Sequence, residues 1–345
     1  MHIRKKTEGD RLKLLQKQTI FSTIKIAGAA SISILFAQFL KIEFPVSAGI
    51  VTILTIQPTK KETLKTAIGR FLAFLVALVL AYFSFSLFGY TMIGFLLYLF
   101  TFIFICQIFQ WNNAMAMNSV LISHFLTFKT MQADNVLNEI LIFCIGVGIG
   151  VIANMHLHKN VNYIETLKIG TDTQIQKILC RMSERILHQD MSDYNGDCFL
   201  VLKNHIRTAK NVAEENYNNQ FGSSDIYDIE YIRMRDKQCQ ILYEMYKNIR
   251  TIDTTPITAE KISVFLKTMA DVYHKDNTGK ELMEQFIELD ESLKTQPLPV
   301  NRKEFEVRAK LYGLLRNIEE FIAIKIAFSE NFIKTKKLFK FYLDK

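Results

Sequence analysis

Hydrophobic and polar positions divide the chain into two stretches with different patterns. Residues 19–158 consist of long apolar runs with few charges, whereas residues 159–345 repeat apolar positions at helical spacing between charged ones. A helix that is apolar on every side suits lipid, and an amphipathic helix packs one face into a bundle. Because no stretch alternates with the period of a strand, we predict an all-α protein. It would consist of a transmembrane helical bundle followed by a cytosolic helical bundle.

The apolar stretch contains six segments that are candidates for crossing a membrane. A spanning helix needs about 20 apolar residues. The second segment is shorter, because Pro45 and Pro58 bound it, and such a helix covers about 21 Å of a core roughly 30 Å thick. It is either a broken, embedded helix or a span completed by the amphipathic residues 59–70. The predicted segments are 19–40, 44–57, 71–88, 92–108, 111–128 and 136–157.

Lysine and arginine are unevenly distributed over the predicted loops. The tail formed by residues 1–18 carries six of them and residues 59–70 carry four, whereas the opposite loops hold only Lys41 and Lys129. Short loops that are rich in Lys and Arg stay in the cytoplasm. We therefore predict a multi-pass protein of the cell membrane with cytoplasmic N- and C-termini.

Residues 159–345 carry almost equal numbers of basic and acidic residues, so most of the net charge of +8 lies beside the membrane. This placement favours anionic lipid headgroups and argues against a nucleic acid as a partner. We expect about five helices, one beginning at Thr255–Pro256 and one at Asn301, with Glu304 completing a capping box. The five cysteines form no CxxC pair, and no zinc, ATP or hydrolase motif is present. We predict no cofactor, no metal and no enzyme activity.

Two charged residues lie within the predicted segments and are candidates for transport chemistry, because ionisable groups are costly inside a bilayer. Lys25 could hold the carboxylate of a substrate in a cavity, or it could extend to the cytosolic interface. Glu139 could carry a proton for coupled efflux, since a desolvated carboxylate binds a proton near neutral pH. The alternative for Glu139 is a solvated carboxylate near the outer interface.

Polar and small residues of the second and fifth segments are further candidates for binding a substrate. A short segment bounded by proline is a sequence pointer to the binding site of a transporter. The fifth segment places its polar residues on one helical face, with Asn118 and His124 beside it. The alternatives are a short helix fixed by packing in the first case and interhelical hydrogen bonds in the second. The candidates are Ser47, Gly49, Thr52 and Gln57, together with Asn112, Ser119 and Ser123.

Small residues form stripes on the third and sixth segments. Gly69, Ala73 and Ala77 follow one another at helical spacing, and Gly146 and Gly150 form a GxxxG pair. Small residues let helix backbones approach closely in a bilayer. We interpret both stripes as helix-packing contacts, and we expect a homo-oligomer.

Short motifs in both stretches resemble a known family. Residues 47–50 read SAGI, residues 59–61 read TKK and residues 64–67 read LKTA, while residues 304–325 read EFEVRAKLYGLLRNIEEFIAIK. Over almost the whole chain, these motifs resemble the aromatic acid exporter family of Gram-positive bacteria, within the fusaric acid resistance-like superfamily. Pro58 departs from the family's pattern where the second segment ends.

The resemblance implies an integral membrane transporter, namely a secondary efflux carrier for small aromatic carboxylates or related organic anions. Two alternatives stay open at this point. One is an organic-anion channel, and the other is a non-transporting, membrane-anchored scaffold whose cytosolic bundle binds a ligand or a partner. The expected partners are the lipid bilayer, small organic anions and further copies of the chain.

Overall fold

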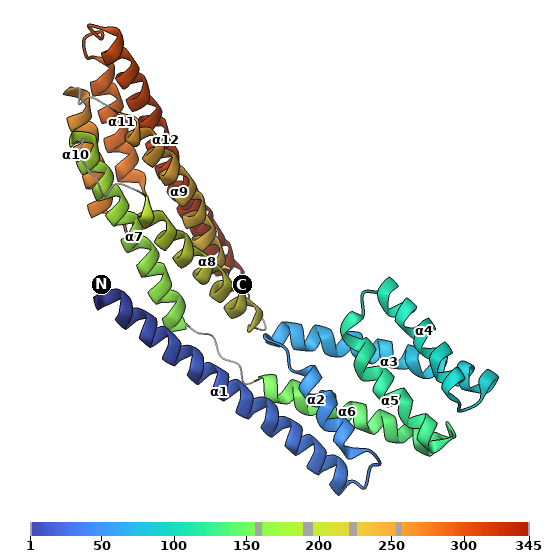
Figure 1. Cartoon of the computed structure of the whole chain (residues 1–345). Coiled ribbons are helices and arrows are strands. Elements are labelled where there is room, and N and C mark those ends of the chain that lie inside the picture. Colours follow the sequence, from blue (N-terminus) through green and yellow to red (C-terminus); the bar gives the residue numbers. More distant parts are fainter. Residues whose placement is uncertain (1, 156–160, 189–195, 221–225, 253–256, 344–345) are drawn as a thin grey trace. The chain divides into compact units, whose positions relative to one another are not determined.

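The computed structural model describes most of the chain (Figure 1), and every regular element of the described residues is a helix, which confirms the predicted all-α class. The backbone is described for residues 2–155, 161–188, 196–220, 226–252 and 257–343. Side chains are described for residues 19–155, 161–188, 196–220, 226–252 and 258–332. The helix start predicted at Thr255–Pro256 lies outside these ranges.

Residue contacts divide the chain into two compact units, and each is described by itself. The apolar unit consists of Met1–Lys159 and Asn218–Gly222, and the bundle unit consists of Asn160–Tyr217 and Ser223–Lys345. The described helices, with the short 3-10 turn η1, are α1 (His2–Phe39), α2 (Pro45–Thr55), α3 (Lys60–Phe88), α4 (Met92–Ile108), η1 (Asn112–Ala114), α5 (Met115–Phe128), α6 (Ala133–Met155), α7 (Val161–Leu187), α8 (Asp197–Asn218), α9 (Tyr227–Arg250), α10 (Ile257–Asp271), α11 (Lys280–Lys294) and α12 (Arg302–Leu343).

Two apolar cores hold the apolar unit together. Helix α2 packs against both α1 and α6, which also contact each other, and α3 packs against α4, α5 and α6. Ala48, Val51 and Phe143 are buried in the first core. Ala77 and Phe102 are buried in the second core, between α3, α4 and α5. The small residues on α2 and α3 let these neighbours come close.

Three described helices are long and apolar enough to cross a membrane, rather than the six candidate segments that the sequence predicted. They are Thr19–Phe39 within α1, Lys60–Phe88 and Ala133–Met155. The other three predicted segments form shorter helices, since α2 has 11 residues, α4 has 17 and α5 has 14. The fifth segment is interrupted by η1, which leaves only its second part as a regular α-helix.

A backbone break separates α2 from residues 59–70. Ile56 is extended, with φ −69° and ψ 117°, and Pro58 has no N–H to continue a helix. Thr59 then starts α3, because its side-chain oxygen accepts a hydrogen bond from the backbone N–H of Glu62 at 3.3 Å. Residues 59–70 therefore form the beginning of α3 and do not complete the second segment, and α3 begins earlier than predicted.

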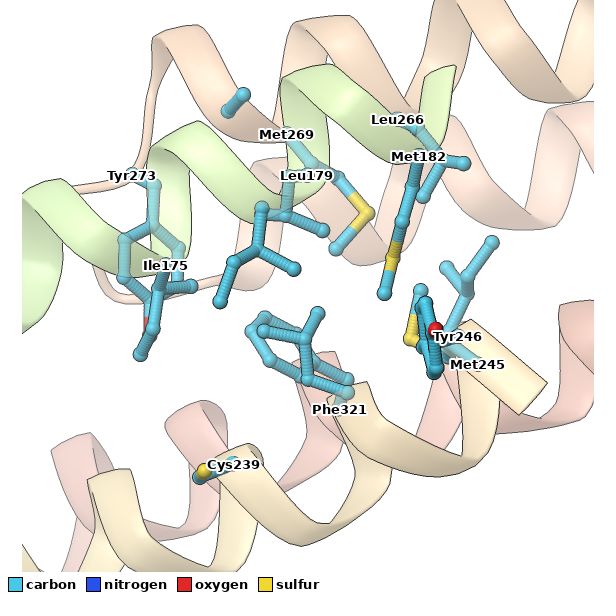
Figure 2. Packing of buried hydrophobic residues seen from close by; sticks show 14 of the residues in the cluster. Ile175, Leu179, Met182, Cys239, Met245, Tyr246, Leu266, Met269, Tyr273 and Phe321 are labelled. Atoms are coloured by element: carbon cyan, nitrogen blue, oxygen red, sulfur yellow. The ribbon is translucent and has the colours of Figure 1, made fainter. Parts of the chain in front are cut away.

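The bundle unit contains six of the described helices, α7–α12, rather than about five. Helix α7 packs against α9 and α10, and α12 packs against α9 and α11. Figure 2 shows part of the core, where Leu179 and Met182 of α7 face Leu266 and Met269 of α10, with Phe321 of α12 nearby. The apolar positions at helical spacing therefore bury one face of each helix in a shared core.

Helix α12 begins with the predicted cap. The side-chain oxygen of Asn301 accepts a hydrogen bond from the backbone N–H of Glu304 at 2.9 Å. The carboxylate of Glu304 in turn accepts the backbone N–H of Val300 at 2.9 Å. The first bond satisfies an N–H group that lacks a partner within the first turn, and the second ties the residue before Asn301 to the helix, which confirms the predicted start. The helix continues to Leu343.

Candidate functional site

The apolar unit exposes large hydrophobic side chains along its long helices. Within the most apolar windows of these helices, only 22–33% of the residues are buried in the structure. Phe39 of α1, Phe83 of α3 and Ile152 of α6 are among the exposed side chains. Apolar surface of this extent is typical of helices that face lipid. Polar groups buried inside such a unit are costly, so they are the first place to look for function.

The first buried polar group, the amide cluster, consists of Lys25, Gln57, Thr63 and Asn154. The side-chain oxygen of Asn154 accepts a hydrogen bond from Nζ of Lys25 at 2.8 Å. The side-chain nitrogen of Asn154 donates to the backbone oxygen of Gln57 at 2.9 Å and to Oγ1 of Thr63 at 2.5 Å. The cluster therefore ties α1, α3 and α6 to the chain segment directly after α2.

Lys25 has a neutral partner in the described part of the chain, namely the amide of Asn154. Its side chain is half-buried, and no ion pair with a carboxylate is present among the described residues. An ammonium group has three N–H donors, so two remain for a further acceptor.

A second cation, Arg70, is buried in the same unit, with 4% of its surface exposed. Its Nε donates a hydrogen bond to the backbone oxygen of Asn113 at 3.1 Å, and Nη1 donates to Oγ1 of Thr55 at 3.4 Å. Both partners are neutral oxygens. The sequence interpretation placed Arg70 in a loop because the third segment was predicted to begin at residue 71, whereas α3 carries Arg70 within its helix.

The second buried polar group, the Glu139 chain, consists of Ser47, His124 and Glu139. Glu139 on α6 has no exposed surface, and its Oε2 lies 2.9 Å from Nδ1 of His124 on α5. The other ring nitrogen of His124 lies 3.2 Å from Oγ of Ser47 in the first turn of α2. A histidine ring that bonds on both sides can bind a proton from one side and release it to the other. Because Glu139 is enclosed, the alternative of a solvated carboxylate is wrong.

Phe44 and Asn138 hold the Glu139 chain in position. The ring of Phe44 stacks on His124, with ring centroids 4.2 Å apart and an angle of 14° between the planes. Phe44 adopts a left-handed backbone (φ 56°), which costs on the order of 1–3 kcal/mol for a residue with a side chain. The amide of Asn138 donates to Oε1 of Glu139 at 3.2 Å and to the backbone oxygen of Glu43 at 3.3 Å. The orientation of His124 and the carboxylate is therefore set by their neighbours.

Gly49 and Thr52 lie where α2 touches its neighbours. A Cβ atom on Gly49 would lie 2.6 Å from the side chain of Ile34 on α1. Oγ1 of Thr52 lies 3.0 Å from the backbone oxygen of Gly146 on α6 and donates a hydrogen bond to it. Both predicted candidates thus take part in helix contacts in the described structure.

The glycines of α6 face α2 at similarly short range. A Cβ atom on Gly146 would lie 2.5 Å from Cβ of Val51, and one on Gly150 would lie 2.9 Å from Cβ of Thr55. Real Cβ atoms essentially never approach that closely, so α2 and α6 can meet here only because these positions lack side chains.

The alanines of the stripe on α3 lie in the unit's second core. Ala73 and Ala77 have no exposed surface and pack in the core shared with α4 and α5. Gly69 is partly exposed, and a Cβ atom there would lie 3.9 Å from the side chain of Trp111. This is ordinary contact distance, so Gly69 needs no close approach in the described structure.

The polar face predicted on the fifth segment is not buried as a unit. Asn112 is exposed in η1, and Ser119 and Ser123 are partly exposed. Ser123 donates a hydrogen bond to a backbone oxygen of its own helix at 2.6 Å. The buried polar residues of α5 are instead Asn118 and His124. The structure therefore brings together Lys25 with Gln57 and Ser47 with Glu139, but it does not bring the predicted residues of α5 to either group.

Sequence reasoning assigned no binding role to Asn154 or Arg70. The sequence signal for Asn154 was its position one turn after Gly150 in an apolar helix. The signal for Arg70 was the capping residue Thr59, because a helix that starts there contains Arg70. Within the part of the chain that the structure describes, no group of three or more His, Cys, Asp or Glu residues could hold a metal ion.

Apolar helices with exposed hydrophobic faces and enclosed polar groups define a helical integral membrane protein, joined in one chain to a charged bundle. Two family models match these two parts. The model "Aromatic acid exporter family member 1" matches residues 18–157, and the model "Putative aromatic acid exporter C-terminal domain" matches residues 162–326. The chain belongs to the aromatic acid exporter family, a family of membrane transporters, which confirms the resemblance seen in the sequence.

Individual proteins are similar to this chain as well. "Uncharacterized protein YqjA" of Bacillus subtilis (strain 168) is 28% identical over 310 residues, which cover 89% of this chain and 95% of that protein. The solved structure "Crystal structure of putative membrane protein from Clostridium difficile 630" is 24% identical with a TM-score of 0.45, and the match covers 50% of this chain and 99% of that chain. The Bacillus relative therefore matches both units of this chain.

Proposed function

We propose that the chain is a secondary carrier that exports small aromatic carboxylates from the cytoplasm. The observation that carries the proposal is Lys25, a half-buried cation of an apolar helix that has a neutral partner and no carboxylate partner among the described residues, in a member of an exporter family. The sequence contains no GxxxxGK[ST] motif for binding ATP, so an ion gradient would supply the energy. The substrate would enter from the cytoplasm and leave by alternating access.

The amide cluster is the proposed place for the carboxylate of the substrate. Lys25 would donate its two remaining N–H groups to that carboxylate, and the buried Arg70 would add a second positive charge to the unit. The attraction between opposite charges is stronger in a low-dielectric interior than in water. The side-chain amide of Gln57 would offer a hydrogen bond to a hydroxyl group on the aromatic ring.

The Glu139 chain is the proposed path for the driving proton. Ser47 lies in the first turn of α2, and Gln57 lies directly after the last turn of the same helix, so α2 joins the two polar groups. A helix of 11 residues is about 17 Å long. Binding or release of a proton at Glu139 would change the hydrogen bond between His124 and Ser47 and thereby bias the position of α2 against α1 and α6.

Membrane placement and assembly complete the proposal. The N-terminal tail and the bundle unit would both lie in the cytoplasm, because Lys and Arg concentrate in the tail and at the start of α3. The glycines and alanines of α3 and α6 pack within the described chain, and small residues on lipid-facing surfaces would serve contacts between copies in a homo-oligomer.

The direct test is uptake of radiolabelled 4-hydroxybenzoate into inside-out membrane vesicles under an imposed pH gradient. We expect gradient-dependent accumulation with the wild-type protein and at least about tenfold slower uptake with Lys25→Gln, because a charged hydrogen bond to the substrate is lost. Lys129→Gln is the matched control, since Lys129 is exposed between α5 and α6. Equal uptake with and without the inserted protein would refute the proposal.

A planar bilayer experiment separates the carrier from the organic-anion channel. A carrier binds and releases one substrate per cycle and gives no single-channel steps, whereas a channel gives discrete current steps. Steps carried by 4-hydroxybenzoate would replace the carrier by the channel alternative.

A further inference from the structure

The bundle unit contains a cavity between α9, α10, α11 and α12. The empty space among the lining side chains is about 290 Å³, including the part that is open to solvent. The walls mix cationic, aromatic and aliphatic side chains, so the charge balance of the cavity decides what could occupy it.

Arg235 forms one wall of the cavity and is fully provided with partners. Its Nε donates a hydrogen bond to Asp172 at 2.8 Å, Nη2 donates to the hydroxyl of Tyr231 at 2.9 Å and Nη1 donates to Gln238 at 2.7 Å. Its guanidinium lies 4.3 Å from the ring centroid of Tyr273. Asp172 therefore balances the charge of Arg235, and both are occupied within the network.

Lys325 of α12 is the second cation that lines the cavity. Only 6% of its surface is exposed, and its Nζ donates a hydrogen bond to the backbone oxygen of Lys275 at 2.8 Å. The rings of Tyr231 and Phe328 lie 5.6 Å from Nζ and provide a weak attraction. No ion pair with a carboxylate is present among the described residues, and two N–H donors of the ammonium have no acceptor there.

Burial makes the charged form of Lys325 less favourable. Burial lowers the pKa of Lys325 to about 8, so the side chain is still mainly charged at neutral pH. A buried ammonium without a counterion is unfavourable. An anion that reached Lys325 would therefore remove an existing penalty as well as form new bonds.

The cavity opens next to the loop between α10 and α11. His274 in this loop is exposed and Asn277 is half-buried, and both line the cavity. Apolar walls come from Met269, Leu282 and Phe321. Figure 2 shows Met269, Tyr273 and Phe321 among the residues of the bundle core. The cavity therefore has a polar entrance, apolar walls and a cation within it.

We propose that this cavity binds a small monocarboxylate with an apolar body, with its carboxylate on Nζ of Lys325 in place of the backbone oxygen of Lys275. One negative charge balances one uncompensated positive charge, and the apolar walls suit an aromatic or branched aliphatic body. Releasing Lys275 would loosen the α10–α11 loop around the ligand. The site goes beyond the proposed transport and belongs to the bundle unit alone, so it would stand even if the apolar unit carried another substrate.

The test uses the full-length protein in detergent with sodium benzoate as the probe. Hydrogen exchange followed by mass spectrometry reports the loop of residues 272–279, and titration calorimetry reports the affinity. We expect benzoate to change the exchange of this loop, and Lys325→Met to abolish the change and weaken binding at least about tenfold. Lys303→Met is the matched control, because Lys303 is exposed on the same helix.

Further variants keep the outcome unambiguous. Lys325→Arg preserves the charge and is expected to retain the exchange effect, which separates charge recognition from damage to the fold. Lys25 belongs to the apolar unit, so Lys25→Gln is expected to leave the hydrogen-exchange response of the loop to benzoate unchanged. A failure of the transport proposal can therefore be told apart from a failure of this one. The proposal is overturned if benzoate leaves the loop unchanged in the wild-type protein. It is equally overturned if neutral benzamide binds as well as benzoate, or if Lys325→Met responds like the wild type.

Discussion

Glu139 is a carboxylate without exposed surface, and its bonds run through His124 to Ser47. A carboxylate in this position can serve two purposes that differ in their consequences. If it only holds α5 and α6 together, its removal affects stability. If it binds and releases protons, its removal affects the coupling of transport to the pH gradient.

The substitution Glu139→Gln separates these roles, because glutamine keeps the shape and a hydrogen bond to His124 but cannot bind or release a proton at neutral pH. We expect the variant to fold and insert, yet to lose gradient-driven uptake of 4-hydroxybenzoate into inside-out vesicles. Glu43→Gln is the control, because Glu43 is exposed in the loop between α1 and α2, and this variant is expected to behave like the wild type. The same gradient dependence in both variants would exclude a proton-carrying role for Glu139.

Lys325 opposes the stability of the folded chain at neutral pH. Its pKa is lowered from 10.5 to about 8 by burial, with Arg235 also lowering it and Asp172 and Asp276 raising it. The unfolded chain therefore binds more protons than the folded chain between about pH 8 and pH 10.5, so the free energy of unfolding rises with pH across that interval. Below about pH 8 the penalty is fully present, and it amounts to about 3 kcal/mol.

The variant Lys325→Met should therefore unfold at a higher temperature than the wild type at pH 7, because a methionine of similar length needs no counterion. The difference should shrink as the pH approaches 10. Circular dichroism melting of the full-length protein measures both effects, with Lys303→Met as the control. A variant that is more stable and binds no benzoate would indicate that Lys325 is retained for binding. A lower melting temperature at pH 7 would contradict the charge argument.

At the scale of the helices, the contact between α2 and α6 depends on glycine at the positions of α6 that face α2. A Cβ atom on Gly146 would lie 2.5 Å from Cβ of Val51 and 2.7 Å from the backbone oxygen of Ala48, whereas a Cβ atom on Gly148 would meet nothing within 4 Å. The two glycines share one helix and differ only in the side of α6 on which they lie. They form a natural pair for testing the packing.

We expect Gly146→Ala to destabilise the protein by about 1–3 kcal/mol, since α2 and α6 must move apart to admit the methyl group. Gly148→Ala should be neutral or more stable by up to about 1 kcal/mol, because alanine favours a helix more than glycine does. Thermal unfolding of the two variants in the same detergent makes the comparison. Equal stability would show that the helices can yield at this contact without cost.

For the whole molecule, the number of crossing helices decides where the termini lie. Three crossings alone would put the N-terminal tail and the bundle unit on opposite sides of the membrane. The basic residues Lys60, Lys61 and Lys65 at the start of α3 favour a return of the chain to the cytoplasm before α3 begins. An even number of crossings would then include at least one of the shorter helices.

Single cysteines in a variant without the five native ones test this arrangement. Lys129→Cys between α5 and α6 should react with a membrane-impermeant maleimide in intact cells, and Lys303→Cys of the bundle unit should react only after permeabilisation. Both lysines are exposed in the structure, so access depends on the side of the membrane. Reaction of both cysteines in intact cells would place the bundle unit outside.

Helix positions could be predicted from the sequence where one strong signal acted alone. Residues 92–108 were predicted as an apolar segment, and α4 covers the same residues. The prediction failed where two signals overlapped. The charges of residues 60–70 resembled a loop, but the cap at Thr59 starts a helix that carries them directly into the apolar part of α3.

The sequence by itself determined the class of protein, because long apolar composition dictates lipid-facing helices and amphipathic spacing dictates a bundle. The sequence also determined the family, through motifs that both family models match. Only the tertiary structure decided which polar residues meet. Lys25 and Asn154 are 129 positions apart and Ser47 and His124 are 77 apart, so local spacing carries no information about either hydrogen bond. Helix packing brings these residues together, and packing depends on all the contacting faces at once.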